Sequence, residues 1–296
     1  MDKSKPKKIA LEQNVENEDD TVSSMCFQDI IRQVKKQTGI SDFPAVIGEN
    51  SLGMPFVFSI EKSPRTFVFS RDYFDIRNFI DKVIVSTIYC ADPNYNKLIL
   101  VDTYISELRM YNCLPHMLVP TVKDDMYLQS VMKWLISEMD RRYYVLSLFR
   151  VKSFNELYHV ITSKMVFEKS LQRITIIIND CSNEFWQQQD FQEDLLKIIS
   201  HGEALGIHII LATSVLNLKW IQKLLATRTY STILFQSALN SPVNKILNMV
   251  PPENISPSDD FIVRFEKSSE VKAIHSYEIS QKEIEYALSF IKQKES

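Results

Sequence analysis

The sequence predicts an α/β fold built on a mainly parallel central sheet with helices on both faces. Three short runs, at 97–102, 173–179 and 208–212, are apolar almost throughout, and the run at 173–179 is rich in β-branched residues. Such runs are typical of strands that are buried on both faces of a parallel sheet. Segments with helical spacing lie between them, and strands that alternate with helices along a chain favour this architecture.

The other elements follow from the same two periodicities. A first helix begins near Phe27 and ends at Gly39, and a stripe of apolar residues from Leu128 to Met139 marks a long helix later in the chain. This long helix spans 126–146, further helices are expected at 74–89, 154–165, 185–205 and 281–292, and further strands at 55–58, 66–69, 232–235 and 261–265.

The composition is that of a globular protein. Of the 296 residues 45% are hydrophobic, which is enough for one large α/β core or two small ones. The net charge of −3 argues against a chain-wide polyanion binder and leaves a local basic patch open. The four cysteines are widely spaced, so we expect no metal site and no disulfide, as in a reducing cytoplasm. No apolar run approaches the ~18–20 residues of a membrane span, so we expect no direct membrane insertion.

Ligands of open parallel sheets bind where the carboxyl ends of the strands meet. In this sequence those positions begin at Ser70, Asp102, Asn179 and Thr213. We therefore look for functional residues at these four places.

Four segments resemble, in order and spacing, the motor domain of FtsK/SpoIIIE translocases. They are 47–55, 101–117, 132–143 and 204–213. The most specific is 132–143, in which Trp134, Met139 and Tyr143 match together with the charged positions between them. The resemblance covers roughly residues 43 to 280 and implies a RecA-like P-loop NTPase fold. It divides the chain into a charged tail at 1–24 that we expect to be disordered, a lead-in helix and strands at 25–60, and the motor domain at 61–296.

The P-loop of that family is absent from this sequence. A P-loop has the pattern G-x-x-x-x-G-K-[ST], in which the glycines let backbone N–H groups approach the phosphates and the lysine neutralises them. The resemblance aligns it with 70–77. Ser70 and Asp75 replace the two glycines, Ile76 replaces the lysine, and Arg77 replaces the hydroxyl residue that holds Mg²⁺.

Other nucleotide-site positions of the family differ as well. Asn179 and Asp180 stand where the family has Asp-Glu, Ser214 stands where it has Gln, and Asn244 falls where the arginine finger is expected. Asp102 matches a family position near the nucleotide, although a carboxylate that caps the strand end explains it equally well. The eight residues from Ser70 to Ser214 therefore form an expected vestigial nucleotide pocket. We expect no catalytic residue, no metal ligand and no bound cofactor, in a family that uses ATP and Mg²⁺.

Trp134 with Arg141 and Arg142 has two interpretations. An aromatic residue interleaved with arginines fits a nucleic-acid patch. A core tryptophan with solvated or ion-paired arginines on an amphipathic helix is the interpretation that we favour.

The resemblance implies three functions in a cytoplasmic setting. The first is an inactive, pseudo-ATPase partner in a DNA-translocation or chromosome-segregation assembly, bound to an intact FtsK-like ATPase or to copies of itself in a ring. The second is a module that binds duplex DNA, or a weakly active ATP-binding translocase. The third is an accessory domain of a type VII-like protein secretion ATPase. The match at 132–143 favours the DNA-translocase branch.

Overall fold

The computed structural model describes residues 26–37, 44–103, 107–163, 171–181, 184–215, 219–226, 230–239, 247, 249–252, 255 and 260–295. Its strands are β1 (Pro44–Glu49), β2 (Pro55–Ser59), β3 (Arg65–Phe69), β4 (Asn96–Val101), β5 (Arg173–Asn179), β6 (Ile207–Thr213), β7 (Ser231–Phe235), β8 (Phe261–Arg264) and β9 (Val271–Ser276). Within the described residues these form one nine-stranded sheet, in the order β2-β1-β9-β8-β7-β3-β6-β5-β4. The tail at 1–24 lies outside the described residues.

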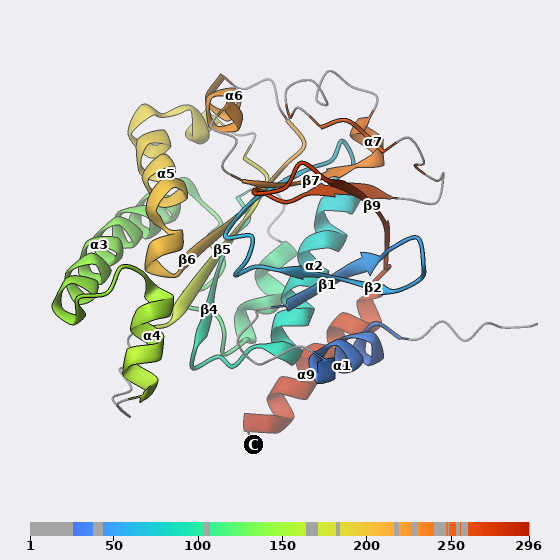
Figure 1. Cartoon of the computed structure of the whole chain (residues 1–296), viewed down its shortest axis with the longest axis horizontal. Coiled ribbons are helices and arrows are strands. Elements are labelled where there is room, and N and C mark those ends of the chain that lie inside the picture. The colour runs from blue at the N-terminus through green and yellow to red at the C-terminus, as the bar shows by residue number, and fades with distance from the viewer. Residues whose placement is uncertain are drawn as a thin grey trace, which may run out of the picture.

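Helices cover both faces of this sheet (Figure 1). They are α1 (Phe27–Gln37), α2 (Tyr73–Cys90), α3 (Asp125–Phe149), α4 (Phe154–Ser163), α5 (Gln189–His201), α6 (Lys219–Ala226), α7 (Gln236–Leu239) and α9 (Gln281–Glu295), with 3-10 helices η1 (Glu107–Cys113), η2 (Glu184–Gln187) and η3 (Glu203–Leu205). The predicted α/β class is confirmed. None of the helices in the described ranges is both long and apolar enough to cross a membrane.

The sheet has a parallel part and an antiparallel part. β4, β5, β6, β3 and β7 are successive neighbours and run parallel. β8, β9, β1 and β2 extend the sheet beyond β7 in antiparallel pairs. The apolar runs of the sequence predicted the parallel part. They gave no signal for β9, because Ile274 is its one buried residue.

The strands of the parallel part separate two apolar cores. On β5, Ile174, Ile176 and Ile178 pack in the core that contains residues of α3, α4 and α5. Ile177 faces the opposite core, which contains residues of α1, α2 and α9. All seven residues of β5 are buried. This two-sided burial explains why the strand is apolar throughout instead of alternating.

The sequence predicted one continuous helix at 185–205, and this prediction is wrong. It is divided into η2, α5 and η3, and the chain then turns sharply into β6. Gly206 has φ +70°, in the left-handed region that favours glycine, and a Cβ atom there would lie 2.6 Å from the ring of Phe154. Ile207 N donates to Gly202 O at 2.8 Å across the turn. Helical spacing alone did not show these interruptions.

A buried lysine joins α2 to the antiparallel part of the sheet. Lys82 is completely buried on α2, and its Nζ donates at 3.0 Å to Ile47 O on β1 and at 3.0 Å to Tyr277 O after β9. It also donates to Ser276 Oγ. Burial lowers the pKa of Lys82 to about 7, although nearby carboxylates, Asp260 first among them, raise it.

Lys82 makes the stability of the fold depend on pH. In the unfolded chain its pKa is 10.5, so between about pH 7 and 10.5 the unfolded chain binds more protons than the folded one. The free energy of unfolding therefore gains up to about 1.4 kcal/mol per pH unit from this residue as pH rises, and the gain is absent below pH 7. We therefore compare wild type with Lys82→Met in urea titrations at pH 7, 8 and 9. The unfolding free energy of wild type minus that of the variant is expected to increase with pH. A difference that stays constant over that range contradicts the assignment.

Candidate functional site

The carboxyl end of β3 is joined to α2 by only three residues, Ser70, Arg71 and Asp72. Asp72 caps the helix, because its Oδ1 accepts a hydrogen bond from Phe74 N at 2.9 Å. Ser70 Oγ accepts from Asp72 N at 2.9 Å and donates to Asp75 Oδ2 at 2.5 Å. The loop is therefore closed by its own side chains. We call these residues, with Asp75 and Ser237, the α2 junction.

Ser237, from the short helix α7, completes the α2 junction. Its Oγ lies 2.9 Å from Ser70 Oγ, donates to Asp75 Oδ2 at 3.2 Å and accepts from Arg71 N at 3.2 Å. The Asp75 carboxylate thus has two hydroxyl partners. Burial raises the pKa of Asp75, and the bonds to Ser70 and Ser237 oppose that rise.

The amino end of a helix attracts anions, because its first N–H groups are unpaired and the helix dipole is positive there. In α2 this end carries two carboxylates of its own, from Asp72 and Asp75. Ile76, at the expected lysine position, is 2% exposed and packs in the core next to α2. The junction therefore lacks the two glycines and the lysine of a P-loop.

Arg77 is the nearest cation on α2, and it is held in ion pairs. Its Nε lies 2.9 Å from both carboxylate oxygens of Asp81, one helical turn away. Its Nη1 donates to Glu107 Oε2 at 3.0 Å. Tyr111 donates to Asp81 Oδ1 at 2.6 Å, and the Asp81 carboxylate therefore has both Arg77 and Tyr111 as partners. Burial raises the pKa of Tyr111.

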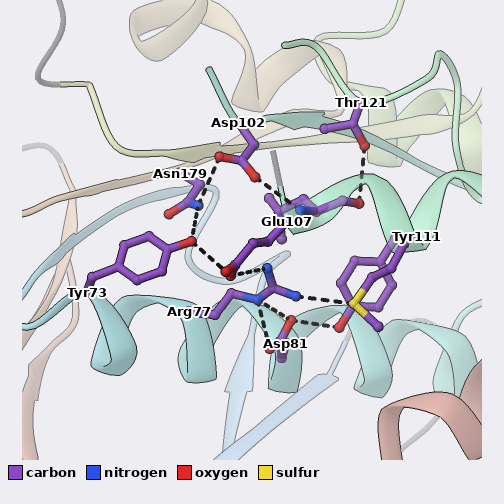
Figure 2. Close-up of polar contacts among 10 residues, drawn as sticks. Tyr73, Arg77, Asp81, Asp102, Glu107, Tyr111, Thr121 and Asn179 are labelled. Atoms are coloured by element: carbon purple, nitrogen blue, oxygen red, sulfur yellow. Dashed lines mark hydrogen bonds and ion pairs between the residues drawn. The ribbon is translucent and has the colours of Figure 1, made fainter. Parts of the chain in front are cut away.

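Polar contacts continue from Glu107 to the ends of β4 and β5 (Figure 2). Tyr73 donates to Glu107 Oε2 at 3.2 Å, and Asn179 Nδ2 lies 3.4 Å from Tyr73 Oη and 3.4 Å from Asp102 Oδ1. Asp102 Oδ2 accepts from Leu108 N at 3.0 Å. The carboxylate thus bonds the backbone of the first turn of η1, which supports its interpretation as a structural cap. We call this set the polar chain: Tyr73, Arg77, Asp81, Asp102, Glu107, Tyr111 and Asn179.

The eight predicted pocket residues fall into separate groups. Ser70 and Asp75 meet in the α2 junction, and Arg77, Asp102 and Asn179 belong to the polar chain. Ile76 is part of the core and meets neither group by a polar contact.

Asp180 and Ser214 lie at the neighbouring strand ends. Asp180 has φ 65°, and Thr213 donates to its Oδ1 at 3.4 Å. Ser214 is half-buried directly after β6. Asn179 Oδ1 is buried and accepts no hydrogen bond from the described residues. The position of Asn244 lies outside the described residues.

Several residues of the site were not predicted. They are Asp72, Tyr73, Asp81, Glu107, Tyr111 and Ser237. The i, i+4 spacing of Arg77 and Asp81 on a predicted helix was a usable signal for their ion pair. So was the acidic residue directly before the helix, which is typical of an N-cap. Ser237 had no such signal, because it reaches the junction from 167 residues away.

The patch proposed around Trp134 is only partly as expected. Arg141 and Arg142 both pair with Glu138 at 2.7 Å, so the favoured ion-paired interpretation is confirmed for them. Arg142 is buried and also donates to Leu205 O and Gln172 O. Trp134 is 42% exposed, so its prediction as a core residue is wrong. It lines a hollow between α3 and the sheet together with Glu138, Arg142 and Ile174 of β5.

The sequence comparisons point to one family. The model of the FtsK/SpoIIIE family matches residues 28–215. A protein named DNA translocase FtsK from Caldanaerobacter subterraneus subsp. tengcongensis is 26% identical over 98% of this chain and 40% of its own length. DNA translocase SftA from Bacillus subtilis is 24% identical over 89% of this chain and 28% of its own length. The chain thus spans less than half the length of these relatives.

Solved structures share the fold. The cytoplasmic domain of the type VII secretion ATPase EccC from Thermomonospora curvata superposes with a TM-score of 0.69 at 16% identity, over 91% of this chain and 34% of that one. The pCW3 conjugation coupling protein TcpA, solved with ATPγS, gives 0.57 at 12% identity, over 88% and 73%. At these identities the likeness concerns the fold alone.

The Arg77–Asp81 pair is expected to be structural. The two side chains are 11% and 8% exposed, and removal of one partner of a buried pair leaves the other charge unpaired. We expect Arg77→Met to lower the unfolding free energy by about 3 kcal/mol in urea titrations. Arg77→Met/Asp81→Asn removes the stranded charge and keeps a partner for Tyr111, so it is expected to recover at least half of the loss. A single variant that costs less than about 1 kcal/mol indicates a solvated pair instead.

Proposed function

Because the chain belongs to the FtsK/SpoIIIE family, we propose that it is a pseudo-ATPase of that family. In this proposal it neither binds nor hydrolyses ATP with Mg²⁺, and it serves as a structural or regulatory subunit of a DNA-translocation assembly. The single observation that carries the proposal is the α2 junction, in which Asp75 lies at the helix end where a P-loop binds phosphate.

Charge and shape both argue against phosphate at this end of α2. Two carboxylates, from the exposed Asp72 and the half-buried Asp75, would face the anion at short range, and like charges repel. No glycine lies between 53 and 202, so the segment 70–77 lacks the residues that allow close backbone approach. The residues present therefore do not fit the triphosphate.

The residues at the position where the family holds Mg²⁺ also argue against nucleotide binding. Asn179 supplies an amide where the family has a carboxylate, and its Nδ2 is directed to Tyr73 and Asp102. Asp102 already accepts a backbone hydrogen bond from Leu108. Mg²⁺ binds through carboxylate oxygens and the phosphates of its substrate, and this geometry offers it few free oxygens.

The partners follow from family membership. We propose that the chain associates with an intact FtsK-like ATPase or with further copies of itself, and that duplex DNA is handled by the assembly. The arginines of α3 are engaged with Glu138, which argues against that helix as a phosphate-contacting surface. The sequence relatives are named DNA translocases, whereas the secretion ATPases resemble this chain at 16% identity, so the DNA role is favoured over secretion.

The proposal predicts that the purified full chain releases no phosphate from MgATP. Malachite-green assays with and without duplex DNA are expected to stay at the protein-free blank, and a P-loop ATPase with an intact G-x-x-x-x-G-K-[ST] sequence serves as the positive control. DNA-stimulated turnover by the chain alone contradicts the proposal.

The subunit role is tested in the same assay. The chain is added to an intact FtsK-family motor from the same cell at ratios up to tenfold. A change in the turnover of that motor near stoichiometry supports the role, and no change at tenfold excess counts against it.

A further inference from the structure

A large pocket lies beside the α2 junction. Its volume is about 920 Å³, and it is bounded by the β1–β2 hairpin, α1, the first turns of α2 and the segment that follows β9. Ligand pockets in proteins typically measure about 300–1,000 Å³. The pocket is therefore large enough for several residues of a peptide. The polar chain at the ends of β4 and β5 contributes no lining residue.

The mouth of this pocket is apolar and exposed. Phe74 on α2 is 78% exposed and Met54 before β2 is 58% exposed, and both line it. Ile30 and Val34 of α1 and Val57 of β2 continue the apolar wall. Large apolar side chains that share one concave surface mark binding sites more often than single exposed ones do.

The charges of the pocket all have one sign. Glu49, Asp75, Asp260 and Glu278 line it, and no lysine or arginine is among its lining residues in the described part of the chain. The histidine of the lining, His275, pairs with Asp260 at 2.9 Å. Lys82 is completely buried and donates to Ser276, which lines the pocket. The pocket is thus acidic around an apolar wall, which repels phosphates and DNA and attracts cations.

We propose that this pocket binds a peptide segment of a partner protein that carries lysine or arginine next to large apolar residues. The apolar side chains lie against Phe74, Met54 and the wall behind them. The cationic groups pair with the carboxylates at the rim, where Glu278 is exposed and Glu49 is half-buried. The proposal rests on the volume, apolar wall and charges of this pocket. It is independent of whether ATP is hydrolysed, so either proposal can fail alone.

The experiment uses fluorescein-labelled peptides and the full chain, with binding followed by fluorescence anisotropy at physiological salt. The probe is a nine-residue peptide of alternating lysine and leucine. Its two controls replace lysine by glutamate, or leucine by serine. We expect the lysine–leucine peptide to bind at least tenfold more tightly than either control, because the pocket requires both the charge and the apolar side chains.

The charge variant of the pocket has a control variant that removes the same number of charges far from the pocket. Glu49→Gln/Glu278→Gln removes two charges from the pocket, and Asp190→Asn/Glu193→Gln removes two from α5, on the other side of the sheet. Met54→Gln/Phe74→Gln removes the apolar mouth at exposed positions, where folding is little affected. We expect each pocket variant to weaken binding at least tenfold and the α5 variant to change it less than twofold.

Three outcomes overturn the proposal. Equal losses in the pocket and α5 variants indicate attraction to the acidic chain as a whole. Equal binding of all three peptides indicates no selection for this chemistry. Sedimentation that shows self-association of the wild type, lost in Met54→Gln/Phe74→Gln, assigns the pocket to a second copy of this chain instead of a peptide.

Discussion

The hydrogen bond between Ser70 Oγ and Asp75 Oδ2, 2.5 Å long, closes the junction of β3 and α2 at the edge of the sheet where ligands of this architecture bind. A loop that wraps a phosphate needs length and glycine. Here the strand passes into the helix after three residues, and Asp72 caps the helix end by accepting a hydrogen bond from Phe74 N. α2 then continues through the interior of the molecule, with Ile76, Phe79 and Ile80 buried.

The remaining charges of the site are neutralised in the same way. Arg77 pairs with both Asp81 and Glu107, Tyr111 donates to Asp81, and Tyr73 donates to Glu107. In a working nucleotide site such groups keep positions open for phosphate and metal. In this chain they join α2 to η1 and to the ends of β4 and β5. The acidic apolar pocket beside the junction has a volume of about 920 Å³, and the charges that line it are carboxylates.

Much of the fold could be predicted because burial on two faces leaves a clear pattern. The run at 173–179 is β5 itself, and the sequence departs from the P-loop pattern at Asp75 and Ile76. The interruption of the helix at 185–205 was not visible, because it depends on the packing of Gly206 against Phe154. β9 was missed because Ile274 is its one buried residue, and Ser237 was missed because its partners in the junction are distant in the chain. Trp134 matched the family motif, but the motif did not indicate that its side chain is exposed in the folded chain.

Calorimetric titration of MgATP into the full chain measures occupancy of the site without requiring turnover. We expect no saturable heat of binding at ATP concentrations up to about 1 mM, where even a free energy of about −4 kcal/mol would be detected. A dissociation constant in the micromolar range would contradict this expectation, since Asp75 would then have to leave the end of α2 for the phosphates to enter.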